Sequence, residues 1–332
     1  MPNLHDIERR IKSVTSTKQI TRTMEMVAAA KIRRASERVE SALPWAVAIS
    51  DMLISTAKYA HLDNEPLLQV HDEVKRVLIV AVTSDRGLAG GFNTNVLRYV
   101  EKLSKEKQRE GAEVEVAACG KKAIGYFTYR GIEPVFSFAG YSADPEFAQA
   151  AELSGYVMQA YAEGKLDEVF IVYNHAKNAA EQTLVEQQVL PVKEESYADL
   201  LGLKAKEEDI FKSFRERDDS AIPGDIDFEP STESVMSYMM NAYLNNAFYY
   251  AMLDSAAGEQ GARRNAMKSA TDNANEMVST LERIYNTVRQ GAITTEITEI
   301  VGGTQGSAAE TPQPRRPIPT RTVRFLADGR RA

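Results

Sequence analysis

The sequence predicts two long terminal helices with a doubly wound α/β domain between them. Near the C-terminus, apolar residues recur at alternating intervals of three and four, at Met267, Ala270, Ala274, Met277, Leu281, Ile284 and Val288. A period of about 3.5 residues is typical of a helix that supercoils against another helix. A similar rhythm occupies the N-terminus. The segment between them alternates short apolar runs with helical patterns, which favours an α/β domain.

The C-terminal helix is expected over residues 231–303. No proline occurs between residues 232 and 301, and a continuous helix of that length would extend on the order of 100 Å. A globular domain does not need such a rod. The length therefore indicates a shaft, strut or lever rather than one wall of a catalytic pocket.

The N-terminal helix is expected over residues 1–60. Its first apolar residues are Leu4, Ile7, Ile11, Val14, Ile20, Met24 and Val27. The interval of six between Val14 and Ile20 breaks the rhythm of three and four and predicts a stutter. Pro44 predicts a bend or an interruption.

The α/β domain is expected over residues 74–195. The predicted strands are 76–82, 113–119, 134–138, 168–173 and 183–192, and the predicted helices are 96–103, 121–129 and 147–162. The alternating pattern of 183–192 is typical of an edge strand. An irregular connector is expected over 196–230, where a charged stretch is broken by Pro223 and Gly224. Residues 304–332 contain four prolines and six arginines, which predicts a disordered tail.

Charge is unevenly distributed along the chain. The net charge is −7, yet residues 1–40 hold nine basic against five acidic residues, and residues 304–332 hold six arginines against two acids. A basic helix can bind nucleic acid, a membrane surface or an acidic protein, or can simply be solvated. Nucleic acid is the least favoured of these partners, because no aromatic residue interleaves with the early basic residues.

The single cysteine, Cys119, lies in an apolar run. A disulfide within the chain is therefore impossible, and we expect a buried, inert thiol in a reducing compartment. No apolar run approaches the roughly 20 residues of a membrane-spanning helix. The N-terminal pattern is amphipathic, so we expect neither a signal nor a transit peptide.

No catalytic constellation is evident. Gly87, Gly90 and Gly91 follow the first strand but match neither a dinucleotide-binding nor a P-loop motif, so we favour a tight structural turn over a nucleotide site. The four histidines, His5, His61, His71 and His175, do not form a spaced metal-ligand set with Cys119. No Gly-x-Ser-x-Gly elbow is present. We therefore predict no catalytic residue, cofactor or metal.

Several segments, in order from one end of the chain to the other, resemble the gamma subunit of bacterial F-type ATP synthases. They are residues 11–14, 18–31, 84–88, 90–93, 228–230, 270–274, 285–286, 289–290, 293–294, 296 and 299–303. The resemblance spans residues 1–303. It is more specific than any single short motif.

The resemblance implies a rotor. The terminal helices would form an antiparallel coiled coil inside a ring of three alpha and three beta subunits, with a Rossmann-like α/β domain at its base. The chain would couple ion-driven rotation of the membrane c-ring to conformational cycling of the catalytic beta subunits, without an active site of its own. It would also meet the epsilon subunit and would lie peripherally on the cytoplasmic face of a bacterial cell membrane. No nucleic acid and no transmembrane segment are implied.

The resemblance also implies contact residues. Met24, Arg289 and Gln290 match positions near the acidic lever and catch loop of a beta subunit. Lys12, Lys18, Arg22 and Lys31 would form a basic face toward that acidic surface, with solvent exposure as the alternative for these lysines. Phe228 and Glu229 would lie near the base, close to the rotor ring and epsilon.

Some features depart from the family pattern. Gly258 and Gly261 are expected to loosen the C-terminal helix, and Arg264 and Asn265 replace the small or apolar residues usual there. The stretch 204–227 is long and lacks the cysteine pair of a thiol switch. The tail beyond residue 303 would emerge at the crown of the ring or be threaded through it, either as a passive extension or as a regulatory or subunit contact.

Two other classes of protein remain possible from sequence. A coiled-coil scaffold would share the helices but has no need of the segments 85–87 and 289–294 together. A nucleotide-dependent α/β enzyme with helical arms would need a phosphate-binding loop, which is missing.

Overall fold

The computed structural model describes residues 3–59, 73–192 and 229–308 of the 332-residue chain. The chain divides into two compact units. The larger unit is Thr15–Asn275, and the smaller one combines Met1–Val14 with Glu276–Ala332. Two helices, one near each end of the chain, contribute to both units.

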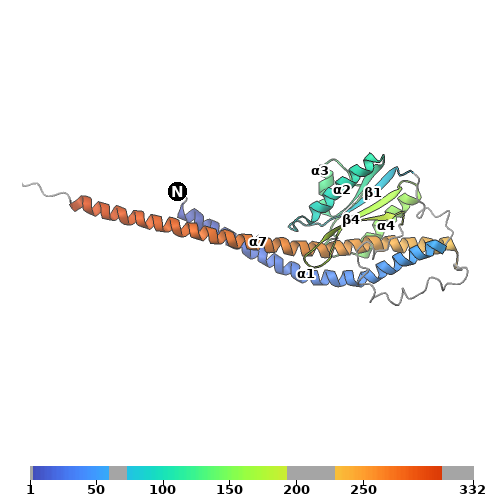
Figure 1. Cartoon of the computed structure of the whole chain (residues 1–332), viewed down its shortest axis with the longest axis horizontal. Coiled ribbons are helices and arrows are strands. Elements are labelled where there is room, and N and C mark those ends of the chain that lie inside the picture. Colours follow the sequence, from blue (N-terminus) through green and yellow to red (C-terminus); the bar gives the residue numbers. More distant parts are fainter. Residues whose placement is uncertain (1–2, 60–72, 193–228, 309–332) are drawn as a thin grey trace, which may run out of the picture. The chain divides into compact units, whose positions relative to one another are not determined.

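The described elements follow the predicted order (Figure 1). They are α1 (Leu4–Tyr59), β1 (Arg76–Val82), α2 (Phe92–Arg109), β2 (Glu113–Cys119), α3 (Lys121–Tyr129), β3 (Phe136–Phe138), α4 (Phe147–Ala162), β4 (Glu168–His175), β5 (Thr183–Leu190) and α7 (Thr232–Ala308). The largest difference from prediction is α2, which is longer at both ends than residues 96–103. Its periodic apolar residues cover only the central turns, because the flanking turns are polar.

The five strands form one sheet in the order β3-β2-β1-β4-β5. β1 pairs in parallel with β2 and β4, and β2 pairs in parallel with β3. β5 runs antiparallel to β4 at one edge. In the centre of the sheet, Ile79 lies between Val116 and Phe170. This is the doubly wound arrangement predicted, with one antiparallel edge strand.

Both faces of the sheet are covered, which explains the continuous apolar run of β1. Val77, Ile79 and Ala81 pack with α2 and α3 on one face. Leu78, Val80 and Val82 pack with α4, α7 and the later part of α1 on the other. A strand buried on both faces has no solvent side for polar residues.

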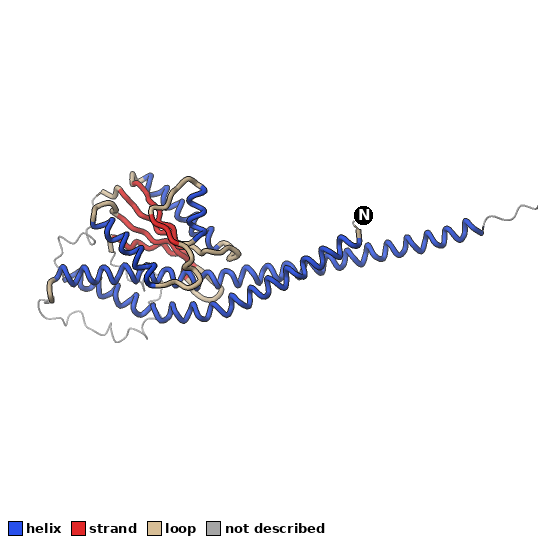
Figure 2. The backbone as a smooth tube through the Cα atoms, turned by 180° about the vertical axis from the view of Figure 1, so that it is seen from behind, coloured by secondary structure: helices blue, strands red, loops and turns tan. Residues whose placement is uncertain are grey.

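Helix α7 lies between the sheet and α1, as both Figure 1 and Figure 2 show. Every residue from position 250 to 261 is buried. Helices buried on all sides are uncommon outside large cores and membranes. Any charged residue in this stretch therefore needs a partner.

Within the larger unit, α1 and α7 run antiparallel. The Thr21 hydroxyl lies 2.8 Å from the Thr271 hydroxyl. Farther along α1, Arg38 donates to the Tyr249 hydroxyl at 3.4 Å. As α1 advances, its partners on α7 move back along the chain.

The predicted stutter in the first helix is wrong. From Ile7 to Ala28, a buried or half-buried residue recurs at regular intervals of four and three, at Ile7, Ile11, Val14, Lys18, Thr21, Glu25 and Ala28, with Thr15 and Met24 half-buried beside this line. Ile20 and Val27 are instead exposed, at 58% and 51%. The seam between the helices continues through polar residues, which a search for apolar spacing cannot detect.

The structure supports the bend rather than the interruption predicted at Pro44, and it changes one predicted boundary. Helix α1 passes through Pro44 without interruption. It changes direction in its second half, as expected where a proline removes a backbone hydrogen bond (Figures 1 and 2). Helix α7 continues to Ala308, through Gly302 and beyond the predicted end at residue 303. Most of the predicted connector 196–230 and the rest of the tail lie outside the described residues.

The predicted apolar seam of the C-terminal helix is only partly buried. Met267 and Ala274 are buried, whereas Met277 and Ile284 are 54% and 43% exposed. Farther on, Ile293, Ile297, Ile300 and Val301 are all about half exposed or more. Contiguous exposed apolar residues usually mark a surface that another molecule covers.

One turn of the sheet accepts only glycine. Gly120, between β2 and α3, has φ of 95°, and a Cβ there would lie 2.3 Å from the Thr83 carbonyl oxygen. We expect Gly120→Ala to lower the free energy of unfolding by about 3 kcal/mol or more, from backbone strain and the clash together. Chemical denaturation of the full chain measures this loss.

Gly125→Ala is the matched control, because Gly125 lies in α3 with no atom within 4 Å of its added Cβ. It should change the free energy of unfolding by less than about 1 kcal/mol, on the stabilising side. Equal effects of the two substitutions would contradict the assignment of strain to Gly120.

Candidate functional site: the junction of shaft and α/β domain

The ligand crevice of a doubly wound sheet lies where the strand order reverses, beyond the carboxyl ends of the two central strands. Here that place is between β1 and β4. Helix α7 occupies it: a Cβ added to Gly258 would lie 3.3 Å from the Asn174 carbonyl oxygen and 3.4 Å from the Phe92 ring. The chain's own helix therefore fills the position that a nucleotide would take.

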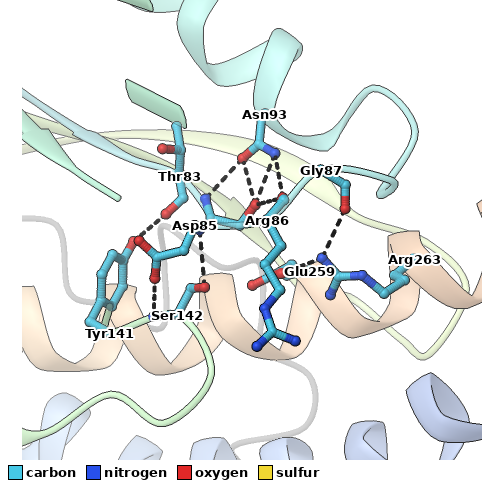
Figure 3. Close-up of polar contacts among 10 residues, drawn as sticks. Thr83, Asp85, Arg86, Gly87, Asn93, Tyr141, Ser142, Glu259 and Arg263 are labelled. Carbon is cyan, nitrogen blue, oxygen red and sulfur yellow. Dashed lines mark hydrogen bonds and ion pairs between the residues drawn. The ribbon is translucent and has the colours of Figure 1, made fainter. Parts of the chain in front are cut away.

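The loop after β1 is held by Asp85. Its carboxylate accepts hydrogen bonds from the backbone N–H groups of Lys121 (3.1 Å) and Gly140 (2.9 Å). It also accepts the Ser142 N–H (3.1 Å), and the Ser142 hydroxyl accepts the Asp85 N–H (3.1 Å) (Figure 3). Burial opposes ionisation, but the three N–H donors outweigh it and hold the pKa of Asp85 below its usual range. Asp85 thus ties three loops together.

Asn93 fixes the other side of the same loop. Its side-chain oxygen accepts from the Ser84 N–H at 2.8 Å, and its amide donates to the Arg86 carbonyl at 3.4 Å. The Ser84 hydroxyl donates to the Arg86 carbonyl at 2.6 Å. The segment that lacks a phosphate-binding motif is thus a tight structural turn, closed by its own side chains (Figure 3).

A buried ion pair joins this loop to α7. Arg263 donates to the Glu259 carboxylate at 2.6 Å and to the Gly87 carbonyl at 3.1 Å. Glu259 is 2% exposed. Burial raises the pKa of Glu259, and the attraction of Arg263 lowers it only in part. The ion pair therefore supplies the partner that a charge at this depth requires.

The turn between β4 and β5 contacts α7 as well. Asp254, which is fully buried, lies 2.7 Å from His175 Nδ1 and accepts the Ala176 N–H at 2.9 Å. Asn265 donates to the Ala180 carbonyl at 2.7 Å. A Cβ added to Gly261 would come within 2.9 Å of the Ala179 carbonyl oxygen.

These contacts correct one expectation from sequence. Gly258 and Gly261 do not loosen α7, which is continuous through both. They let the sheet and the β4–β5 turn approach the helix closely, a common role of glycine. Asn265 likewise has a structural partner in the turn.

Within residues 3–59, 73–192 and 229–308, no cluster of three His, Cys, Asp or Glu side chains is placed to hold a metal ion. Cys119 is buried in the sheet, and this burial raises the pKa of its thiol. In the same ranges no helix is both long and apolar enough to cross a bilayer.

The predicted contact residues fall into the two units. Met24 and Lys31 line one cavity of about 490 Å³ together with Arg86 and Lys121. Lys18 and Arg22 precede them on α1, with Lys18 half-buried and Arg22 exposed.

The remaining predicted contact residues lie outside the larger unit or away from the junction. Lys12, Arg289 and Gln290 belong to the smaller unit and are exposed. Glu229 is exposed at the start of the segment that leads into α7, and Phe228 lies outside the described residues.

Sequence reasoning missed the residues that build the junction: Asp254, Glu259 and Arg263. One signal was available, because Glu259 and Arg263 have the spacing of four that pairs an acid with a base on one helix face. Their position among alanines and glycines marks a place of close packing. The partner of Asp254 is distant in sequence and could not be found by spacing.

The fold and this junction define a class of protein in which a long helix pair carries an α/β domain, and in which that helix closes the domain's ligand crevice. A family model described as ATP synthase matches residues 3–306. The ATP synthase gamma chain of Heliobacterium modesticaldum is 40% identical over 304 residues, which is 91% of this chain and 98% of that protein. That of Streptomyces coelicolor is 36% identical over 305 residues, 91% and 95% of the two chains. The chain belongs to the ATP synthase gamma chain family.

Solved structures agree with this assignment. A chain of the Tetrahymena thermophila mitochondrial ATP synthase central stalk and c-ring matches with a TM-score of 0.57 and 26% identity, over 76% of this chain and 99% of that one. A chain of the Euglena gracilis mitochondrial ATP synthase matches with a TM-score of 0.62, over 95% and 98%. At 20% identity, the second match supports the fold alone.

The Asp85 carboxylate should stabilise the folded state only at a pH where it is ionised. We expect Asp85→Asn to lower the free energy of unfolding at pH 7 by about 1–3 kcal/mol, because an amide accepts the three N–H groups poorly. Since the folded-state pKa is depressed, the wild type loses this contribution as pH falls below about 4. Unfolding measured between pH 7 and pH 3 should show the two proteins converging. A pH-independent difference would count against the assigned role of the charge.

Removing Arg263 should leave Glu259 buried without its counter-charge. We expect Arg263→Met to cost about 3–5 kcal/mol at pH 8. The deficit should shrink as pH falls, because the raised pKa of Glu259 means that protonation in the folded state removes the buried charge. Urea unfolding at several pH values tests this. The double variant with Glu259→Gln should be less destabilised than Arg263→Met alone, and the reverse order would refute the pairing.

Proposed function

We propose that the chain is the central rotor shaft of an F-type ATP synthase, where it couples ion-driven rotation of a membrane ring to conformational cycling of catalytic beta subunits. The observation that carries this function is the resemblance to gamma chains along almost the whole length. The length of α7 suits it, because a helix of 77 residues is longer than an α/β domain needs.

The two terminal helices act together as an antiparallel coiled coil. The Thr21 and Thr271 contact, the Arg38 and Tyr249 contact and the regular four-three seam of α1 support this arrangement in the larger unit. A coiled coil resists bending and twisting better than one helix alone, since each side chain of the seam is held by the partner.

The surrounding ring consists of three alpha and three beta subunits. The exposed apolar residues of the C-terminal part of α7, such as Ile293, Ile297 and Ile300, support a partner that encloses this end. The chemistry takes place on the beta subunits, and this chain is not catalytic. The crevice filled by α7 agrees with that assignment.

The basic face of the shaft meets the acidic lever of beta. Met24 and Lys31 border the cavity shared with Arg86. Lys12 and Arg22 add exposed basic side chains along α1, and Lys18 is half-buried at the seam with α7. Arg289 and Gln290 meet the neighbouring catch loop. Opposite charges at such a surface favour one orientation of the shaft over another.

The asymmetry of the shaft couples its rotation to the nucleotide affinity of the beta subunits. One eccentric rod presents a different face to each beta subunit, and each face stabilises a different nucleotide affinity. A contact can shift a subunit only by its differential free energy between conformations. Rotation then moves each subunit through the states in turn.

The base of the rotor meets the c-ring and the epsilon subunit. Glu229, exposed at the start of the segment into α7, and its neighbour Phe228 contribute there. The whole chain lies at the cytoplasmic face of a bacterial cell membrane and is held by these partners rather than by a span of its own.

The proposed contact of Arg289 and Gln290 with the catch loop of a beta subunit allows a direct test of the rotor function. We expect Arg289→Ala with Gln290→Ala to lower proton-driven ATP synthesis by about fivefold to tenfold, a loss of about 1–1.4 kcal/mol of coupling. Synthesis by inverted membrane vesicles measures it, after assembly is verified by the subunit content of the membranes.

Arg283→Ala is the matched control, since Arg283 is another exposed arginine of α7 and has no proposed subunit contact. It should leave synthesis unchanged. Unchanged ATP synthesis in the double variant would show that Arg289 and Gln290 do not contribute to the torque contact. Tight ATP binding by the isolated chain would instead favour a nucleotide-dependent protein.

A further inference from the structure

The polar contacts and the glycine close approaches of α7 to the loops of the α/β domain lie on two opposite faces of the helix. A helix turns about 100° per residue, so Asp254, Gly258, Gly261 and Asn265 fall in a stripe about 60° wide. By the same geometry, Glu259 and Arg263 lie about 140° and 180° around the helix from Asp254. The two sets bind different parts of the domain.

The β4–β5 turn, residues 176–182, holds the first face. It receives the Asn265 amide at the Ala180 carbonyl (2.7 Å), and its Ala176 N–H donates to Asp254 (2.9 Å). Its Ala179 carbonyl lies against Gly261, where an added Cβ would be only 2.9 Å away.

The turn is preformed for this role. The Asn178 side chain accepts the N–H groups of Ala180 (2.8 Å) and Glu181 (2.9 Å). Lys177 also pairs with Glu181 across the turn at 3.4 Å. These side-chain contacts within the turn fix its conformation, so contact with α7 requires no further ordering of the turn.

The loop after β1 holds the opposite face. Arg263 donates to the Gly87 carbonyl, and Asp85 ties that loop to two others through three backbone N–H groups. A third side of α7 faces α1, where Leu253 and Ala256 line a cavity of about 230 Å³ with Ala35. The helix is thus enclosed from three directions over little more than three turns.

We propose that the β4–β5 turn and the Gly87 loop form a clamp that prevents α7 from turning within the α/β domain, and that Gly261 and Asn265 are positioning residues for torque transfer. This inference rests on the proposed rotor function. Torque that enters at the base must pass from the domain into the shaft. A clamp on opposite faces resists rotation in both directions, whereas a one-sided contact would let the helix slip.

Gly261→Ala tests the clamp, because the new methyl group meets the backbone of the turn. In inverted vesicles we expect ATP hydrolysis to change by less than about twofold while protons pumped per ATP fall by about threefold or more, within the range by which single residues modulate coupling. Gly155→Ala is the control: Gly155 is also helical, and nothing lies within 4 Å of its added Cβ. It should change neither quantity.

Asn265→Asp provides a second variant of nearly equal shape, in which a carboxylate oxygen replaces the donor to the Ala180 carbonyl. It should also lower the pumping ratio, and it decides the question if Gly261→Ala does not assemble. An unchanged ratio in Asn265→Asp membranes, with normal hydrolysis, overturns the clamp. Wild-type vesicles that hydrolyse no ATP and pump no protons would overturn the rotor function itself, and the clamp with it, so the two failures are distinguishable.

Discussion

The structure depends on the burial of one stretch of α7 between α1 and the sheet. Residues 250–261 have no solvent-facing side, so the polar groups there require partners within the protein. Asp254 has His175 and the Ala176 N–H, and Glu259 has Arg263. His175 and Ala176 lie where β4 ends and the β4–β5 turn begins, and Arg263 binds the loop that contains Gly87. Both loops lie at the carboxyl edge of the sheet. The need to satisfy buried charges thereby fixes how the helix and the α/β domain are joined.

The same helix has a different character beyond Asn275. Met277 and Ile284 are exposed there, Leu281 and Val288 are half-buried, and every residue from 291 to 302 is exposed, with Ile297 at 56% and Ile300 at 61%. One half of α7 is thus a core helix of the α/β domain, and the other half is a surface suited to other subunits. A rotor needs this division, because it must be rigidly attached to its own base and slide against its surroundings. A fully self-contained helix could not contact a ring, and a fully exposed one could not carry torque.

The sequence predicts the elements better than the contacts. The strand 76–82 was predictable because its uninterrupted apolar run, residues 77–82, has few alternatives to a buried strand. The seam of α1 was mispredicted between Val14 and Met24, since Thr21 replaces an apolar residue and hydrogen-bonds to Thr271. The role of Gly261 could not be predicted from the sequence either. Alone it suggests a flexible helix, and only the position of Ala179 shows that it is a point of close approach. Contacts distant in sequence leave no local pattern to read.

In the proposed function, the α/β domain and the shaft turn together within an ATP-hydrolysing complex. Tyr129 is 89% exposed on the α/β domain, and Cys119 is buried, so Tyr129→Cys offers one reactive thiol for a bead. The measurement is single-molecule observation of that bead on a surface-fixed complex supplied with ATP. We predict stepwise rotation in one direction with three dwell positions in each turn. A bead that stays still while the same complexes hydrolyse ATP would show that the α/β domain does not rotate during hydrolysis, contrary to the proposed rotor function.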